Sequence, residues 1–471
     1  MMNNPRQSAF EILLSLEKSS SFADVLVDRQ LSSGALHGPD RGLLTELVFG
    51  VLRRRGSLDY IIGECSTQKL AKLERPVLIL LRLGLYQMLY LDRIPVSAAV
   101  NETVRLAKRF TPRAAGFINA VLRKADRAGD AIPWPDREAD PAGFLAARHS
   151  HPRWLIEQWS AQVGPGEIEP LAGAMSGTPP LTLRANTLKI SRDDLQSLLA
   201  ERGHEGRPTL FSPFGVHLSR TAHPSTLPGF EEGLFTVQDE SSQLATMFLA
   251  PRPGESILDL CAAPGGKATH LAQMMENRGS IFACDRDEAR LRRVRENSGR
   301  LGVSIIETVK LDASRPLTAL EGRRFHRILL DAPCSGLGVL RRNPEAKWRL
   351  TPADAGRLAS LQGAILRTAV EHLEEGGVLL YSTCSTSLEE NELLVDNFVS
   401  ERNDFVIENL NSIFPEYSSL FTGGGFFRSW PHRQGMDGFF AARLRRTGEN
   451  TLHRDLTSLL LPACPTAPEV S

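Results

Sequence analysis

The feature that most constrains the fold is a regular alternation of short apolar segments and helical segments between residues 251 and 444. Apolar segments such as 256–260 and 280–285 are followed by stretches in which apolar residues recur at helical spacing, for example 288–302. This alternation is typical of a doubly wound parallel sheet whose faces are covered by helices. The sequence therefore predicts a Rossmann-like α/β domain over residues 246–445.

The first predicted strand of this domain ends in a glycine-containing turn, CAAPGGK. Ligands of open α/β sheets bind beyond the carboxyl ends of the strands, and paired glycines leave room for a ligand near the backbone. The nucleotide-triphosphate motif G-x-x-x-x-G-K-[ST] fails, because its first glycine is replaced by Cys261 and Ala268 follows Lys267. The dinucleotide motif G-x-G-x-x-G is missing too. S-adenosyl-L-methionine, which has no pyrophosphate, is the remaining interpretation, with a loop of Cys261, Ala262, Ala263, Pro264, Gly265, Gly266 and Lys267.

Three further strands of the predicted sheet end in an aspartate. Asp285 ends the second strand, where a carboxylate can accept hydrogen bonds from both ribose hydroxyls. Asp312 ends the third strand, in reach of an adenine edge, and Asp331 ends the fourth, beside the reacting groups. One aspartate at a strand end is more often a turn former or a helix cap. Three at successive strand ends predict cofactor binding.

Two cysteines directly follow predicted strands, Cys334 in DAPCSGLG and Cys384 in YSTCS. A cysteine in an apolar stretch is usually an inert core residue, which suits Cys261 and Cys284. Cys334 and Cys384 instead lie among turn-forming residues at the sheet edge that carries the cofactor loop. A thiol facing a methyl donor fits methylation of carbon 5 of cytosine. The thiolate adds to carbon 6, carbon 5 takes the methyl group, and a base then removes the carbon 5 proton.

The rest of the chain predicts two further domains. Residues 1–130 show helical spacing throughout and favour an all-α bundle. They hold 19 Lys/Arg and 13 Asp/Glu, a net charge of +6 that suits RNA and an ordinary solvated surface equally well. A proline-rich stretch at 131–151 predicts a linker, and 152–245 predicts a small α+β module of ferredoxin or RRM type. The tail, 446–471, shows little pattern.

Taken together, these motifs resemble the RNA 5-methylcytosine methyltransferases. The resemblance rests on LDLCAAPGGKATHLA, DAPCSGLG and YSTCS, with LRANTLK (183–189) and VQDESSQ (237–243) before them and WPHRQGMDGFF (430–440) after them. The N-terminal stretches GLLTELVFGVLRRRGSLDYII and PVSAAVNETVRLAKRF resemble a NusB-like RNA-binding domain. The whole arrangement, over about residues 5–444, resembles the RsmB (Sun, Fmu) branch, which acts on small-subunit (16S) ribosomal RNA.

The resemblance implies roles for the two cysteines. Cys384 would be the nucleophile that adds to carbon 6, and Cys334 would aid product release as base or relay. The substrate would be a single-stranded or flipped cytosine of ribosomal RNA, because a base inside a stem cannot reach a strand-end thiol. The same chemistry on transfer RNA or another ribosomal cytosine stays open, as does a non-catalytic RNA-binding or antitermination factor. A NAD-dependent dehydrogenase is disfavoured by the missing dinucleotide motif.

Several sequence properties bear on the cellular compartment of the protein and on metal or membrane binding. The six cysteines show no metal-ligand spacing, which predicts a reducing compartment and no metal site, and Cys65 and Cys464 receive no role. No apolar run approaches the roughly 18–20 residues of a membrane helix, and the N-terminus does not look like a signal peptide. We therefore expect a cytoplasmic monomer without a membrane partner.

Two local patterns near the cysteines are ambiguous. Arg341, Arg342 and Lys347 form a basic stretch that would contact RNA phosphate or lie as an ordinary solvated loop. Ser387, followed three residues later by Glu390, fits a capping box for the next helix.

Overall fold

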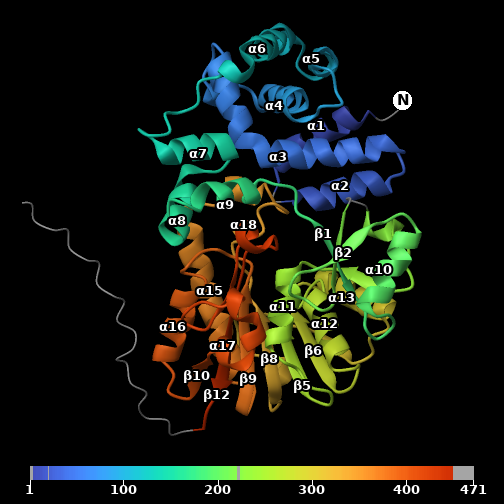
Figure 1. Ribbon diagram of the computed structural model, residues 1–471, viewed down its shortest axis with the longest axis vertical. Helices are drawn as coiled ribbons and strands as arrows, with labels where there is room; N and C mark the ends of the chain where they lie inside the picture. Colours follow the sequence, from blue (N-terminus) through green and yellow to red (C-terminus); the bar gives the residue numbers. More distant parts are fainter. Residues whose placement is uncertain (1–3, 20, 220–222, 449–471) are drawn as a thin grey trace, which may run out of the picture.

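The computed structural model describes residues 4–19, 21–219 and 223–448 (Figure 1). Most of the predicted tail, including Cys464, lies outside these residues. A helical domain lies at the top of the molecule in Figure 1, a layer of three short helices lies below it, and two sheets form the lower half. No helix in the described ranges is both long enough and apolar enough to cross a bilayer.

The N-terminal domain is a helical bundle around one buried apolar cluster, as the sequence predicts. Its longest helix is α3, and α4 passes through the centre with apolar residues on nearly all sides. Inside this core the Arg82 guanidinium donates to both carboxylate oxygens of Asp59, at 2.7 and 2.8 Å. The helices are α1 (Pro5–Leu16), α2 (Ala23–Ser32), α3 (Pro39–Cys65), α4 (Arg75–Tyr90), α5 (Val96–Phe110) and α6 (Ala115–Ala128).

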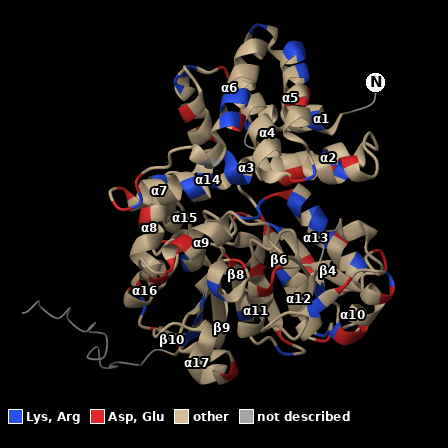
Figure 2. Cartoon of the chain, turned by 45° about the horizontal axis from the view of Figure 1, so that its top comes forward, with Lys and Arg blue, Asp and Glu red and all other residues tan. Residues whose placement is uncertain are grey.

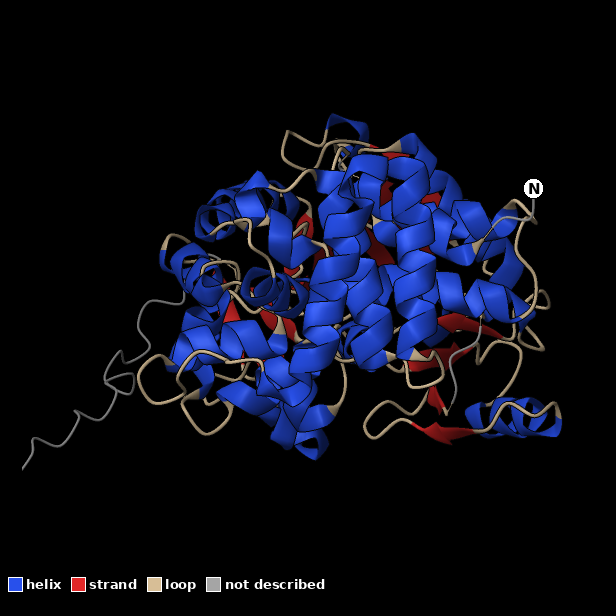
Figure 3. Cartoon of the chain, turned by 90° about the horizontal axis from the view of Figure 1, so that it is seen from above, coloured by secondary structure: helices blue, strands red, loops and turns tan. Residues whose placement is uncertain are grey.

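Charged side chains of the bundle are mixed rather than segregated. Figure 2 shows Lys and Arg along α3, α5 and α6, with acidic residues between them. Seen from above, the bundle helices cover much of the molecule, with strands beneath them (Figure 3).

The second half of the predicted linker is a packed helix. α7 (Pro141–His149) begins after Asp140, whose carboxylate caps it by accepting from the amide of Gly143 at 3.0 Å. With α8 (Arg153–Val163) and α9 (Ile168–Met175), α7 builds an apolar cluster that includes Leu337, Leu340 and Trp430 of the catalytic domain. These helices therefore form a layer between the bundle and the catalytic domain.

The predicted α+β module is confirmed as a four-stranded antiparallel sheet with the order β2-β3-β1-β4. Its apolar face is closed by α10 through Leu195 and Leu199, which pack on Leu183 and Phe235. The elements are β1 (Leu181–Ala185), α10 (Arg192–Glu201), β2 (Gly206–Pro208), β3 (Gly215–Leu218) and β4 (Phe235–Val237).

The described part of the catalytic domain forms an eight-stranded sheet with the order β10-β12-β9-β8-β5-β6-β7, and β11 pairs with β12. The strands β9-β8-β5-β6-β7 are parallel, as predicted, but β12 runs antiparallel to both β9 and β10. The strands are β5 (Ser256–Leu260), β6 (Ser280–Asp285), β7 (Ile306–Lys310), β8 (Phe325–Asp331), β9 (Leu373–Thr383), β10 (Phe405–Glu408), β11 (Phe427–Ser429) and β12 (Phe439–Arg446).

Helices cover both faces of this sheet. Ile257 and Leu258 are consecutive in β5 and belong to two different buried clusters, one on each face. α15 and α16 pack on the Leu258 side, and α11 and α12 pack on the Ile257 side. The helices are α11 (Glu240–Phe248), α12 (Gly266–Met274), α13 (Glu288–Leu301), α14 (Ala346–Arg349), α15 (Pro352–Val370), α16 (Glu392–Ser400), α17 (Leu410–Ile413) and α18 (Pro431–Gln434).

The bundle is attached to the catalytic domain by the segment around α14. Trp348 donates through its indole nitrogen to the carbonyl of Leu52 at 3.3 Å, and the Lys347 ammonium donates to the carbonyl of Arg53 at 3.1 Å. Lys347 is only 1% exposed, and burial lowers the pKa of its ammonium well below the usual range. Lys347 therefore holds two domains together, and the expectation that it contacts RNA phosphate or solvent is wrong.

The module is joined to the cofactor loop by one buried guanidinium. Arg184 of β1 donates to the carbonyl of Gly266 at 2.6 Å, to the Thr269 hydroxyl at 3.1 Å, and to Gln238. Burial lowers the pKa of Arg184 to about 9. The LRAN motif thus fixes the first turn of α12 from outside the catalytic domain.

We predict that Arg184→Lys destabilises the protein by about 2–4 kcal/mol, because the ammonium cannot replace the fork of donors and leaves buried acceptors unpaired. Thermal unfolding of the full chain measures the effect. Arg207→Lys, on the exposed strand β2, is the matched control and should melt like the wild type. Equal melting temperatures for the two variants would contradict this role of Arg184.

Candidate active site

The two strand-end cysteines lie side by side. β8 and β9 are parallel neighbours in which Asp331 is opposite Ser382, so both chains leave the sheet at the same level. Cys334 and Cys384 follow directly, and their sulfur atoms are 3.3 Å apart. Both side chains are partly exposed. The structure thus brings together the two residues that the sequence singled out for catalysis.

A close backbone contact fixes the two cysteine turns against each other. Gly338, in the turn after Cys334, donates its amide to the carbonyl of Cys384 at 2.9 Å, and its own carbonyl accepts from the amide of Gly438 at 2.9 Å. A Cβ atom at position 338 would lie 2.0 Å from the Gly438 oxygen. Only glycine fits there, which explains the second glycine of SGLG.

A charged pair lies next to the thiols. The Lys267 ammonium is 2.7 Å from one carboxylate oxygen of Asp331, and the Ser382 hydroxyl donates to the other oxygen at 3.0 Å. Lys267 also lies over the ring of Phe439, with its nitrogen 5.0 Å from the ring centroid. The first turn of α12 and the ends of β8 and β9 therefore meet at one point.

A cavity of about 290 Å³ opens beside this pair, at the carboxyl ends of the strands. Asp259 of β5 lines it and is fully buried, and neither of its carboxylate oxygens has a hydrogen-bond partner. Burial, and then the Asp331 carboxylate, raise the pKa of Asp259 well above the usual range. The cavity is lined by Val237, Gln238, Asp239, Ser242, Asp259, Cys261, Ala262, Ala263, Pro264, Gly266, Lys267, Asp331, Arg342 and Asp437.

The predicted cofactor loop forms one wall of this cavity. Its backbone is left-handed at Cys261 (φ 62°) and at Gly265 (φ 100°), and α12 begins at Gly266. A Cβ atom at position 265 would lie 3.2 Å from Val294, so this glycine also meets α13 closely. Burial raises the pKa of the Cys261 thiol to about 12, in keeping with an inert side chain.

The remaining two predicted aspartates differ in their surroundings. Asp285 ends β6 and is buried, and its Oδ2 atom accepts no hydrogen bond, although it lies 3.4 Å from the Arg290 guanidinium. Asp312 lies two residues beyond β7 and is about half exposed, and its carboxylate accepts from the amide and hydroxyl of Ser314. Neither residue lines the cavity of the loop, so their contacts with a cofactor remain predictions.

A buried ion cluster forms the opposite wall. Arg342 donates to Asp239 at 2.7 Å and also to Asp437, and Arg341 donates to Asp437 at 2.7 Å. Burial alone would raise the pKa of Asp239, but the two guanidinium groups lower it to about 2. For Asp437 burial prevails and raises its pKa. Both arginines are bound to acids within the protein, so the expectation of an ordinary solvated basic loop is wrong, and contact of Arg342 with RNA phosphate stays a prediction.

Glu390 has a different role from the one its sequence spacing suggested. α16 begins at Glu392 with Asn391 as its cap, so Ser387 and Glu390 do not form the predicted capping box. The Glu390 carboxylate is instead fully buried beneath the cysteine turns, where it accepts from Ser335 and Ser385. Sequence reasoning missed this residue and also Asp259, which was taken only as part of a strand.

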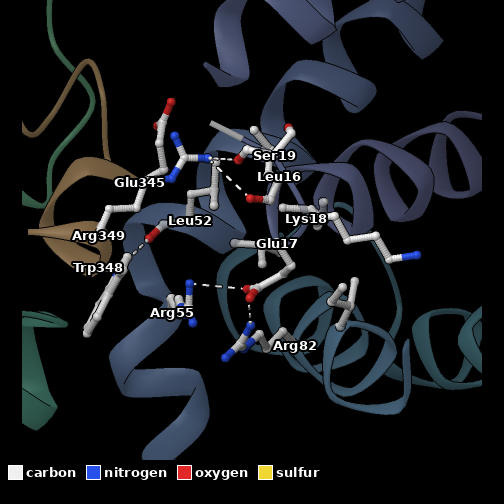
Figure 4. Close-up of a pocket in the computed structure, with 13 residues that line it drawn as sticks. Leu16, Glu17, Lys18, Ser19, Leu52, Arg55, Arg82, Glu345, Trp348 and Arg349 are labelled. Carbon is white, nitrogen blue, oxygen red and sulfur yellow. Dashed lines mark hydrogen bonds and ion pairs between the residues drawn. The ribbon is translucent and has the colours of Figure 1, made fainter. Parts of the chain in front are cut away.

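A second cavity, of about 430 Å³, lies between the bundle and the segment around α14 (Figure 4). Figure 4 shows Glu17 between Arg55 and Arg82, with ion pairs of 3.2 and 3.4 Å. Trp348 and Arg349 reach into the same region from the catalytic domain. Neither Cys334 nor Cys384 lines this cavity.

Comparison with known proteins agrees with this architecture. Family models match three parts of the chain: the NusB family at 3–127, the Methyltr_RsmF/B-like ferredoxin-like domain at 151–223, and the 16S rRNA methyltransferase RsmB/F at 246–445. Among solved structures, PH0851 covers 94% of this chain and 98% of its own, with a TM-score of 0.79 and 28% identity. NSun6 from Pyrococcus horikoshii with SFG covers 63% of this chain and 99% of its own, with a TM-score of 0.56 and 26% identity. The fold and the matching family models together show that the chain is an RNA methyltransferase.

Two curated relatives narrow this class to a family. The probable ribosomal RNA small subunit methyltransferase B of Bacillus subtilis (strain 168) is 38% identical over 94% of this chain and 99% of its own length. The ribosomal RNA small subunit methyltransferase B of Escherichia coli O1:K1 / APEC is 39% identical over 91% of this chain and 95% of its own length. The chain belongs to the ribosomal RNA small subunit methyltransferase B (RsmB, Sun) family.

We predict that Gly338→Ala destabilises the protein by about 2–4 kcal/mol, because the new Cβ atom forces the two cysteine turns apart. Differential scanning calorimetry measures the loss. Gly356→Ala in α15 is the control, since a Cβ atom there meets nothing within 4 Å. A Gly338→Ala protein as stable as Gly356→Ala would show that the contact with Gly438 does not fix the turns.

Proposed function

We propose that the protein transfers a methyl group from S-adenosyl-L-methionine to carbon 5 of a cytosine in small-subunit (16S) ribosomal RNA. The observation that carries the proposal is the pair of thiols 3.3 Å apart, at the strand ends beside the Lys267–Asp331 pair. A transient bond to carbon 6 of a pyrimidine requires one nucleophile, and its release requires a group that takes the carbon 5 proton; the two thiols can fill these two roles. The names of the curated relatives support ribosomal RNA of the small subunit as substrate.

Cys384 is proposed to begin the reaction. After it loses its proton to solvent, its thiolate bonds to carbon 6, and the electron pair of the carbon 5–carbon 6 double bond makes carbon 5 nucleophilic. Asp331, held by Lys267 and Ser382, is proposed to accept a hydrogen bond from the exocyclic amine of the entering base. The Lys267 ammonium, which pairs with Asp331, would offset the negative charge that thiolate addition places on the ring.

Cys334 is proposed to release the product as a proton relay. Hydrogen bonding with Cys384 and burial raise the pKa of Cys334 well above the usual range, so it keeps its proton at neutral pH. In the release step the carbon 5 proton moves to the sulfur of Cys334 while the original Cys334 proton moves to the sulfur of Cys384. The electrons of the carbon 5–hydrogen bond re-form the double bond, and the carbon 6–sulfur bond breaks.

The residues around the cavity fit the proposed cofactor. Asp259 offers a buried carboxylate without a hydrogen-bond partner, which suits the ammonium of an amino-acid end. Asp285, outside the cavity lining, has a buried oxygen that accepts no hydrogen bond and would take the ribose hydroxyls. The loop from Cys261 to Lys267 would hold the region between them, and Asp312 would lie at the adenine. Bound S-adenosyl-L-methionine supplies the methyl group that carbon 5 takes.

The two other domains are proposed to hold the RNA. The base must be single-stranded or flipped to reach the thiols, so flanking RNA needs a separate grip. The NusB-like bundle and the ferredoxin-like module are both anchored to the active site, through Lys347 and Arg184 respectively. The predicted compartment is the cytoplasm, where thiols stay reduced. Methylation of a transfer RNA cytosine is the alternative, which mapping of the methylated base would decide.

We predict that Cys384→Ala abolishes both methyl transfer and any covalent enzyme–RNA adduct, whereas Cys334→Ala lets the adduct form but slows its resolution. Release of the adduct needs the relay, and its formation does not. Denaturing gels with labelled RNA and labelled methyl donor measure both. Cys65→Ala, a buried bundle cysteine, is the control. An adduct in Cys384→Ala and none in Cys334→Ala would reverse the two roles.

We also predict that Asp285→Asn weakens binding of S-adenosyl-L-methionine by roughly tenfold or more, since the ribose hydroxyls lose a charged acceptor worth about 1.5–3 kcal/mol. Isothermal titration calorimetry without RNA measures it. Glu288→Gln, an exposed acid three residues later, is the control. No heat of binding in the wild type would favour a non-catalytic RNA-binding protein.

A further inference from the structure

A single buried carboxylate connects the turns that carry the two cysteines. Oε1 of Glu390 accepts from the Ser335 amide at 2.8 Å, and Oε2 accepts from the hydroxyls of Ser335 and Ser385. Ser335 follows Cys334 directly and Ser385 follows Cys384 directly. The two serine oxygens are themselves 2.9 Å apart. Each reacting thiol is thus one residue away from the same carboxylate.

The contacts around Glu390 extend to the other side of Cys334. Gln362 of α15 donates through its amide nitrogen to Glu390 at 2.9 Å and to the carbonyl of Pro333 at 3.0 Å. The Tyr381 hydroxyl donates to the Gln362 amide oxygen at 3.1 Å, which orients the amide. Cys334 is therefore held on both sides, through Pro333 by Gln362 and through Ser335 by Glu390.

The charge of Glu390 is unusual for its position. Among the described residues, no Lys or Arg side chain forms an ion pair with it, and the carboxylate is fully buried. An ionised carboxylate away from water costs several kcal/mol unless cations or several donors surround it. Four donors surround this carboxylate: the Ser335 amide, the Ser335 and Ser385 hydroxyls, and the Gln362 amide nitrogen. A glutamine has one accepting oxygen instead of two, so it cannot accept from all four donors.

The charge of Glu390 also acts on the thiol of Cys334. The titratable groups around it are Tyr381 from β9, Cys384 directly after β9, Asp331 from β8, which is paired with Lys267, and Glu390 from the turn before α16. Hydrogen bonding to Cys384 and burial are the larger causes of the raised pKa of Cys334, and the Glu390 charge acts in the same direction. A negative charge opposes loss of a proton from a nearby thiol.

We propose that Glu390 is a positioning residue of this active site: its carboxylate holds the two cysteine turns together, and its charge keeps the proton on Cys334. The inference rests on the proposed function, in which that proton passes to the sulfur of Cys384 when the product leaves. Glu390 itself touches neither sulfur in the structure and acts through Ser335 and Ser385.

The test compares Glu390→Gln with Glu389→Gln in the full chain. Both remove one negative charge from the same turn, but Glu389 is exposed and does not contact Ser335 or Ser385. Alkylation of Cys334 by iodoacetamide is followed against pH without RNA, by mass spectrometry of the cysteine peptide. Glu390→Gln should move the Cys334 midpoint to lower pH by about one unit, because the thiolate is no longer disfavoured by the carboxylate. Glu389→Gln should follow the wild type.

Turnover gives the second readout. Glu390→Gln should lower kcat by roughly 10- to 100-fold with little change in KM for RNA, since a small misplacement of reacting groups is costly. Its adduct should accumulate, and its activity should fall at a lower alkaline pH than that of the wild type. Identical Cys334 alkylation profiles for Glu390→Gln, Glu389→Gln and the wild type would overturn the inference.

A second variant covers the case in which Glu390→Gln does not fold. Ser385→Ala removes one hydroxyl that Glu390 holds but keeps the charge, so it should slow turnover without moving the Cys334 midpoint. Unchanged turnover in Ser385→Ala would contradict the holding of the turns. The two proposals can fail separately, because alkylation is measured without RNA. Absence of a wild-type enzyme–RNA adduct would contradict the proposed function but would not change the alkylation result for Cys334.

Discussion

The parallel pairing of β8 and β9 is the constraint on which the active site depends. Asp331 and Ser382 are opposite each other in the sheet, so the residues that follow them leave the core together. This register brings Cys334 and Cys384, 50 residues apart in the chain, to a sulfur–sulfur distance of 3.3 Å. A register shift of one residue in either strand would move the side chains of that strand to the opposite face of the sheet. The two thiols would then no longer be in contact.

The segment that links β8 to α15 connects the cysteine turn to other parts of the protein. It contains Cys334, then Arg342 in the cavity wall, and then Lys347, which donates to the backbone of α3. One stretch of chain therefore touches a reacting thiol, the proposed cofactor site and the bundle. The bundle is thus linked to Cys334 through this segment, whereas the ferredoxin-like module contacts the other wall through Arg184.

The sequence predicted those parts of the candidate site whose residues lie next to one another in the chain. The loop from Cys261 to Lys267 and the strand-end residues Asp331, Cys334 and Cys384 were all identified from local pattern, because a strand that ends in polar residues marks the edge of a sheet. The same holds for the helical bundle and the module. The antiparallel strand β12 was not anticipated, since strand order depends on contacts far apart in the chain.

Residues whose role depends on distant partners were misread or missed. Arg342 looks solvated in sequence because its partners Asp239 and Asp437 are 103 and 95 positions away. Asp259 resembles any polar residue within a strand, and nothing local shows that it lines a cavity without a partner. Glu390 fits a helix cap by spacing alone, and only the packed structure shows that its oxygens point at the two cysteine turns instead.

These misread residues share a physical property, which is a buried charge beside the proposed reaction. Burying an ion pair seldom adds net stability, because the desolvation cost offsets the attraction. Such charges are therefore better explained by what they hold in place: Asp239 and Arg342 join α11 to the segment after β8, and Glu390 joins the two cysteine turns. In a site with little water, fixed dipoles and charges need no reorganisation when charge develops on a substrate. The stability given up in burying them is thus consistent with selection for geometry at the thiols rather than for a more stable fold.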